Sequence, residues 1–171
     1  MRHINTNTGE QLVNALHILG VKFIMGGKDS GASPYKQPAR LIAALAESKE
    51  ARLRLSLIPL FFEYPEFATV VRRVAGRLDP SARLTLQCYY SAAVWLQQKY
   101  HLSLDALIGE KISLPDYFSF ELGMQPTSDP EINLVRLAQR HQTLSKTSVN
   151  WLGTYKHAAQ VWLKGLELQK A

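Results

Sequence analysis

The apolar positions of this chain recur mainly at helical spacing, and breaks rich in Gly, Pro, Ser or Asp separate the runs. Residues 12–19 carry apolar side chains three and four positions apart, which predicts a helix that ends at Gly20. The sequence Thr-Gly-Glu-Gln at residues 8–11 is typical of a capping box that opens such a helix. The short apolar run at residues 21–25 predicts at most one brief strand near the N-terminus.

The central block, residues 40–100, contains one phrase twice. Ala-Arg-Leu-Arg-Leu at residues 51–55 returns as Ala-Arg-Leu-Thr-Leu at residues 82–86, and each copy follows a short apolar run and a break. This repeat favours two helical hairpins of similar design, stacked to form the main core. Chance recurrence of residues that are common in helices is the alternative explanation.

Prolines and their neighbours predict where the other helices begin. Pro38 suits the first turn of a helix that runs to about residue 47, and Ser48 is expected to cap the next helix. Pro59 should kink or divide that second helix, because it removes a backbone donor. Further helices are expected to begin at Pro65, at Asp79-Pro80, near residue 104, at Asp129-Pro130 and at Ser148.

Two segments are predicted to be irregular. Residues 26–37 hold three glycines, two serines and Pro34, which indicates a loop. Residues 109–128 show weak periodicity, and we expect this segment to pack its apolar side chains against the bundle. Those side chains are Leu114, Tyr117, Phe118, Phe120 and Leu122. The apolar side chains of the helix that follows are Ile132, Val135, Leu137 and Leu144.

Together these patterns predict an all-α protein, a single domain over residues 1–171 with about seven helices and the two stacked hairpins at its centre. The chain has 171 residues, and 46% of them are hydrophobic and 20% charged, as in globular rather than disordered proteins. No run of about 18 apolar residues occurs, and the N-terminus lacks a secretion signal, so no membrane partner is expected. The single cysteine, Cys88, allows no internal disulfide and suits the cytoplasm.

The net charge of +6 favours an anionic partner, such as nucleic acid or an acidic protein surface. Arginine is well suited to that role, since its guanidinium group binds phosphate or carboxylate through two parallel hydrogen bonds. The candidate contacts are Arg72, Arg73, Arg77, Arg136 and Arg140. The alternative is a solvated surface, with arginines of the central block paired to Glu47, Glu50 and Asp79.

The sequence Gly-Gly-Lys-Asp-Ser at residues 26–30 follows an apolar run and resembles the PP-loop of ATP pyrophosphatases. In that family, backbone amides of the loop hold the pyrophosphate of ATP. The resemblance implies a phosphate site at Gly26, Gly27, Asp29 and Ser30, although Met25 stands where the pattern has its first Ser. A flexible surface loop is the alternative interpretation.

Arg136 and His141 have the Arg-x4-His spacing of HEPN ribonucleases, which are small helical dimers often encoded beside a nucleotidyltransferase. The resemblance implies that Arg136 would clamp an RNA phosphate and that His141 would act as the acid/base group. Leu137 replaces the polar residue that usually follows the arginine. A basic solvent-facing surface with a half-buried histidine is the alternative.

The histidines show no metal-ligand spacing with one another or with Cys88, so no metal site and no cofactor are expected. Our sequence-based interpretation is a non-enzymatic helical binding or assembly subunit that docks on a partner protein, in a toxin–antitoxin or defence-type complex. The alternatives are a basic nucleic-acid-binding protein, or a HEPN-like ribonuclease that uses Arg136 and His141.

Overall fold

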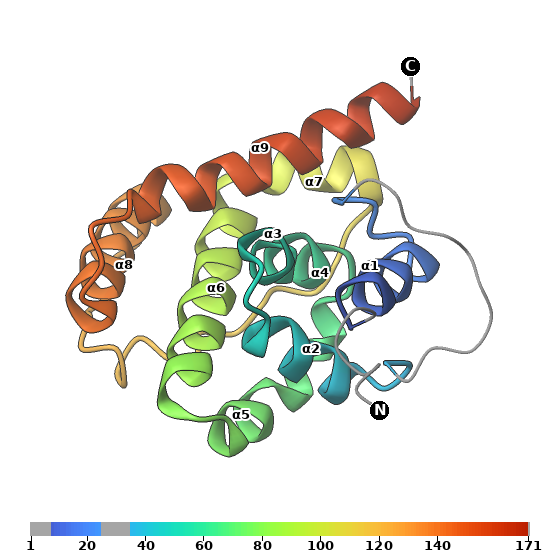
Figure 1. Ribbon diagram of the computed structural model, residues 1–171. Coiled ribbons are helices and arrows are strands. Elements are labelled where there is room, and N and C mark those ends of the chain that lie inside the picture. The colour runs from blue at the N-terminus through green and yellow to red at the C-terminus, as the bar shows by residue number, and fades with distance from the viewer. Residues whose placement is uncertain (1–7, 25–34, 171) are drawn as a thin grey trace, which may run out of the picture.

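The computed structural model describes residues 8–24 and 35–170, and all the regular structure in this part of the chain is helical (Figure 1). Helix accounts for 72% of the structure and strand for 0%, which confirms the all-α prediction. Residues 21–24, where one brief strand was allowed, belong to neither helix nor strand.

The first helix, α1, spans Thr8–Ile18, so Thr8 is itself helical rather than the cap that the sequence predicted. Its end at Gly20 is confirmed. Gly20 has a φ of 81°, and the Val21 N–H donates to the Leu16 carbonyl at 2.9 Å. This arrangement is a Schellman motif, in which glycine adopts the left-handed conformation at low cost.

The next helices are α2 (Pro38–Glu47), α3 (Ala51–Leu55) and α4 (Leu57–Glu63). The predicted bounds of α2 are confirmed. Glu50 rather than Ser48 precedes α3, and the Ser48 hydroxyl instead accepts a hydrogen bond from the Glu50 N–H at 3.1 Å.

Pro59 divides the predicted helix, as expected, but the break falls at Ser56, three residues earlier. Proline has no N–H to donate to the carbonyl four residues before it, so Pro59 fits best in the first turn of a new helix. Pro59 therefore lies in the first turn of α4, and α3 remains a separate short helix.

The centre and C-terminal half contain the remaining helices. A 3-10 turn at Pro65–Phe67 leads into α5 (Ala68–Arg77), and α6 (Pro80–Lys99) begins where the Asp79 side chain accepts from the Ala82 N–H at 2.9 Å. The helix α7 spans His101–Ile108, so it begins three residues before the predicted start, and residues 109–128 are largely irregular, as predicted.

Two helices complete the fold: α8 (Pro130–Ser145) and α9 (Trp151–Lys170). Asp129 caps α8 as predicted, through the Glu131 N–H. Asn150 rather than Ser148 caps α9, because its side-chain oxygen accepts from the Gly153 N–H at 3.0 Å.

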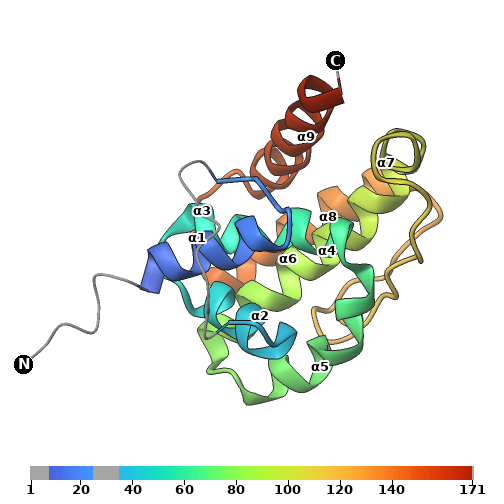
Figure 2. The ribbon, with the colours of Figure 1, turned by 90° about the vertical axis from the view of Figure 1, so that its right-hand side faces the viewer.

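Helix α6 is the centre of the bundle, with α8 on one side and α9 crossing its C-terminal end (Figure 1). Figure 2 shows the same helix running through the molecule behind α1 and α4. Every residue from 86 to 96 is buried, including Cys88. A helix with no polar face is expected to be enclosed on all sides, and α6 is packed against α2, α4, α5, α8 and α9.

The two copies of the doubled phrase lie in α3 and at the start of α6, and α2 packs against both of these helices. The surroundings of the two copies differ: Ala51 is exposed in the five-residue helix α3, whereas Ala82 is buried in the first turn of α6. Each copy nevertheless supplies an arginine that holds the end of the preceding helix. Arg54 donates to the Ser48 carbonyl at 2.8 Å, and Arg83 donates to the Ala75 carbonyl at 2.9 Å.

Candidate functional site

The three arginines predicted for the centre of the chain lie on the outer side of α5. Arg72, Arg73 and Arg77 are exposed, whereas Val71 and Val74 of the same helix are buried. This helix is strongly amphipathic, so its packing against the core leaves the arginines facing solvent.

Arg72 is held in place by an aromatic contact. Its guanidinium carbon lies 5.5 Å from the centre of the Tyr117 ring, and that ring stacks on Tyr90 at a centroid distance of 5.6 Å. Arg73 and Arg77 form no ion pair within residues 8–24 and 35–170. Of the acidic partners considered from the sequence, Glu50 pairs with Arg52 of the central block at 2.9 Å, as the solvated-surface alternative expects, and Asp79 caps α6.

The prediction that all the aromatic residues of the irregular segment pack inward is wrong for Phe120, whose side chain is 95% exposed. The segment turns sharply at this point, since the Leu122 N–H donates to the Phe118 carbonyl at 2.9 Å. Phe118 and Leu122 are buried, so the turn places Phe120 on the outside. We call the set formed by Arg72, Arg73, Arg77, Tyr117 and Phe120 the arginine–aromatic face: α5 and the irregular segment meet where Arg72 contacts Tyr117, and Phe120 lies three residues after Tyr117.

The other two candidate arginines lie on α8, apart from α5 (Figure 1), and bind backbone carbonyls. Arg136 donates to the Gln125 carbonyl at 2.7 Å, and Arg140 donates to the Leu122 carbonyl at 2.7 Å. The guanidinium group of Arg140 also lies against Gly123, which has a φ of 75°. Both arginines fasten the irregular segment to α8.

His141 is buried, with only 3% of its surface exposed, and it joins α8 to α9. Its Nδ1 is hydrogen-bonded to the Tyr155 hydroxyl, and its ring stacks on Trp151 at a centroid distance of 3.5 Å. Burial lowers the pKa of His141 to about 3, so the imidazole is neutral at pH 7. No sequence signal linked His141 to Trp151 or Tyr155, which lie in the next helix.

Arg136 and His141, which the HEPN-like alternative requires to act together, occupy different environments. The Arg136 side chain lies at the surface with a carbonyl partner, whereas His141 is enclosed by aromatic rings. Within this protomer the two side chains do not converge on a common site.

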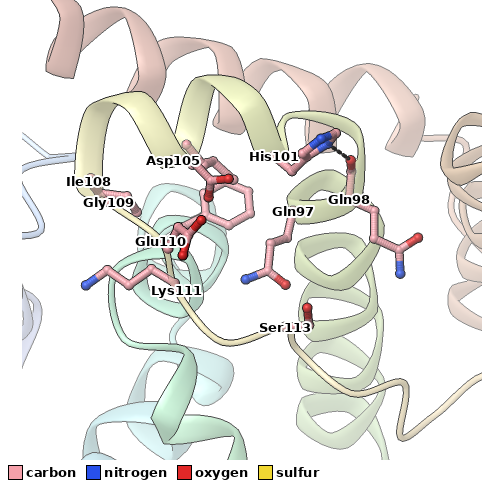
Figure 3. A pocket seen from close by; sticks show the side chains of 11 residues that line it. Gln97, Gln98, His101, Asp105, Ile108, Gly109, Glu110, Lys111 and Ser113 are labelled. Carbon is pink, nitrogen blue, oxygen red and sulfur yellow. Dashed lines mark hydrogen bonds between the residues drawn. The ribbon is translucent and has the colours of Figure 1, made fainter.

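A hollow of about 460 Å³ lies between the end of α6, helix α7 and residues 109–113 (Figure 3). The buried Phe62 ring contributes to its lining, and Asp105 and Glu110 are on the same side of it. His101 is on the opposite side, where its Nδ1 lies 3.0 Å from the Gln98 carbonyl.

Two local features shape this hollow. Gly109 ends α7 with a φ of 80°, which turns the chain so that Glu110 follows directly onto the rim. Gln97 fastens the next residues to α6: its amide donates to the Ile112 carbonyl at 2.9 Å and accepts from the Leu114 N–H at 2.7 Å.

The remaining sequence-predicted site, Gly26, Gly27, Asp29 and Ser30, lies outside the described residues. Among the residues that the structure does describe, no group of three or more His, Cys, Asp or Glu side chains could hold a metal ion. Nor does that part of the chain contain a helix long and apolar enough to cross a membrane. No protein-family model, curated protein or solved structure matches this chain.

Proposed function

We propose that this protein is a non-enzymatic docking subunit that binds a partner protein through the arginine–aromatic face. The observation that carries the proposal is the fully exposed Phe120, held by a tight turn in the same segment as the Tyr117 ring that Arg72 contacts. Aromatic residues and arginine are enriched at protein interfaces and dominate their binding energy. Arg73 and Arg77 are exposed and form no ion pair within the described residues, which favours an acidic partner surface.

A protein partner is favoured over nucleic acid for two reasons. Arg136 and Arg140 already bind carbonyls, which leaves three of the five candidate arginines for phosphate groups. The surface also exposes large aliphatic side chains, which contribute to protein interfaces but not to contacts with a phosphate backbone. These include Leu102, Ile112, Ile132 and Val135.

The state of His141 gives no support to the ribonuclease alternative. An acid/base group works best with a pKa near the operating pH, and burial moves the pKa of His141 to about 3. Its Nδ1 is occupied by Tyr155. A toxin–antitoxin or defence setting for the complex stays a prediction from the sequence.

The test compares two double variants of the tagged full chain by quantitative affinity purification. Phe120→Ser with Arg73→Glu alters the arginine–aromatic face. Leu168→Ser with Lys164→Glu makes matched changes at exposed positions of α9. We expect one partner protein to be recovered in a fixed ratio with the wild type and the α9 control, and at least tenfold less with the face variant.

Equal recovery with both variants would overturn the proposal. So would tight binding of single-stranded RNA or duplex DNA to the isolated protein at about 150 mM salt, if the face variant abolished that binding. Nucleic-acid binding of this kind weakens steeply with salt, because each neutralised phosphate releases a counterion.

A further inference from the structure

The hollow shown in Figure 3 carries local negative charge on a chain whose net charge is +6. Asp105 and Glu110 line it and are exposed. Lys111 also lines it, but its ammonium group points away in Figure 3 and acts electrostatically on Glu63, where it opposes the rise in pKa that burial causes. Asp105 and Glu110 therefore give the hollow two carboxylates that form no ion pair within the described residues.

Helix α7 ends at the hollow, since Ile108 and Gly109 both line it. The C-terminal end of a helix carries partial negative charge, and the Lys170 ammonium already donates to the Leu107 carbonyl at this end. The free negative charge of the hollow therefore comes from Asp105 and Glu110 rather than from the backbone. Phe62 adds apolar surface to the same wall, and apolar surface suits the methylene stem of an arginine side chain.

Two of the most exposed aliphatic side chains stand next to the hollow in the sequence. Leu102, which is 75% exposed, follows the lining residue His101. Ile112, which is 63% exposed, lies between the lining residues Lys111 and Ser113. A small free cation would leave both side chains in water, whereas a peptide segment with apolar residues beside its charged group would cover them.

We propose that this hollow is a second docking site, which takes an arginine side chain from a partner segment whose neighbouring residues are apolar. The guanidinium group fits two carboxylates better than an ammonium group does, because its fork of N–H donors binds carboxylate oxygens in pairs. The apolar neighbours of that arginine cover Leu102 and Ile112. Together with the arginine–aromatic face, this hollow would give the protein two docking sites of opposite charge.

The test uses a phage-displayed library of random 12-residue peptides, selected on the full-length protein. We expect enrichment of arginine flanked by apolar residues. The best peptide is then synthesised with arginine and with citrulline, which has a similar shape and no charge. Citrulline should weaken binding at least tenfold in fluorescence anisotropy.

Protein variants locate the site. Asp105→Asn with Glu110→Gln should weaken the arginine peptide at least tenfold, and Leu102→Ser should weaken it severalfold. Glu47→Gln with Glu167→Gln removes the same charge at exposed positions elsewhere and should change binding less than twofold. Thermal melting of each variant confirms that these exposed substitutions leave the fold intact.

Any of three binding outcomes would overturn the inference: no arginine-containing peptide among those selected, equal binding to the Asp105→Asn/Glu110→Gln variant, or displacement of the peptide by free arginine amide at equal concentration, which would show that the apolar neighbours add nothing. Concentration-dependent dimerisation that requires Asp105 and Arg73 would also overturn it, by naming a second copy as the occupant. The Phe120→Ser/Arg73→Glu variant should bind the peptide normally, so failure of the α5 proposal and failure of this one are separable.

Discussion

The outer side of α5 and the inner side of α8 use the same kinds of residue in opposite ways. On α8, Arg140 binds the Leu122 carbonyl and His141 binds the Tyr155 hydroxyl, so both side chains hold segments together. On α5, Arg73 and Arg77 face solvent. A basic side chain therefore stabilises the fold where a carbonyl or hydroxyl of another segment lies within its reach, since a buried polar group without a partner is costly.

The largest effect on stability should come from His141, the buried basic residue of α8. His141→Ala should lower the free energy of unfolding by about 3 kcal/mol, because it leaves a cavity beside Trp151 and a Tyr155 hydroxyl without its partner. Chemical denaturation measures this change. A loss below about 1 kcal/mol would mean that the packing of α9 on α8 does not depend on the imidazole.

Acid should weaken the same contact between α8 and α9. The pKa of His141 is about 3 in the folded protein, against 6.5 for an ordinary histidine, so the unfolded state binds the proton more readily. The stabilisation is full above pH 6.5 and is lost as pH falls towards 3. A drop from pH 6.5 to pH 5 should cost about 2 kcal/mol, at about 1.4 kcal/mol for each pH unit.

The control for this pH effect is His141→Phe with Tyr155→Phe, which keeps two stacked rings and removes both polar groups. Carboxylates elsewhere also titrate in acid, so the informative quantity is the difference between the wild-type and control pH profiles. Parallel profiles from pH 6.5 to pH 5 would show that His141 is protonated in the folded state as easily as in the unfolded one.

The arginines should show the smallest effects, and those effects should differ between the two helices. Arg140→Ala should cost about 1–2 kcal/mol, because it removes a charged donor from the partly buried Leu122 carbonyl. Arg73→Ala or Arg77→Ala should change stability by less than about 0.5 kcal/mol, as is usual for exposed positions away from special contacts. Equal losses of stability for the α5 and α8 variants would show that the contact of Arg140 with the Leu122 carbonyl does not stabilise the fold.

Local chemistry made much of the fold predictable. Gly20 ends α1 in a left-handed conformation that glycine adopts most readily, and Asp79 caps α6 through a hydrogen bond three residues away. Pro59 divides a helix because it lacks an N–H. Each of these effects operates within about four residues, so the sequence alone contains the information.

The orientation of the helix faces was less predictable. Of the apolar residues expected along α8, Leu137 is buried but Ile132, Val135 and Leu144 are exposed. The reason is that α8 turns Asn133, Leu134, Leu137 and His141 towards the core. Periodicity predicts a helix, but which face packs inward depends on the neighbouring helices. Phe120 is a similar case, since a turn of the irregular segment rather than hydrophobicity decides its exposure.

The helical class, the helix boundaries at Gly20, Pro38, Asp79 and Asp129, and the excess of positive charge could therefore be predicted from the sequence alone. Only the tertiary structure decided which charges are free, because Arg136 and Arg140 meet carbonyls 11 and 18 residues away, and His141 meets Tyr155 14 residues away. The hollow beside Asp105 likewise needs α6, α7 and residues 109–113 to meet. Contacts between distant segments depend on how the whole chain packs, and no local spacing encodes them.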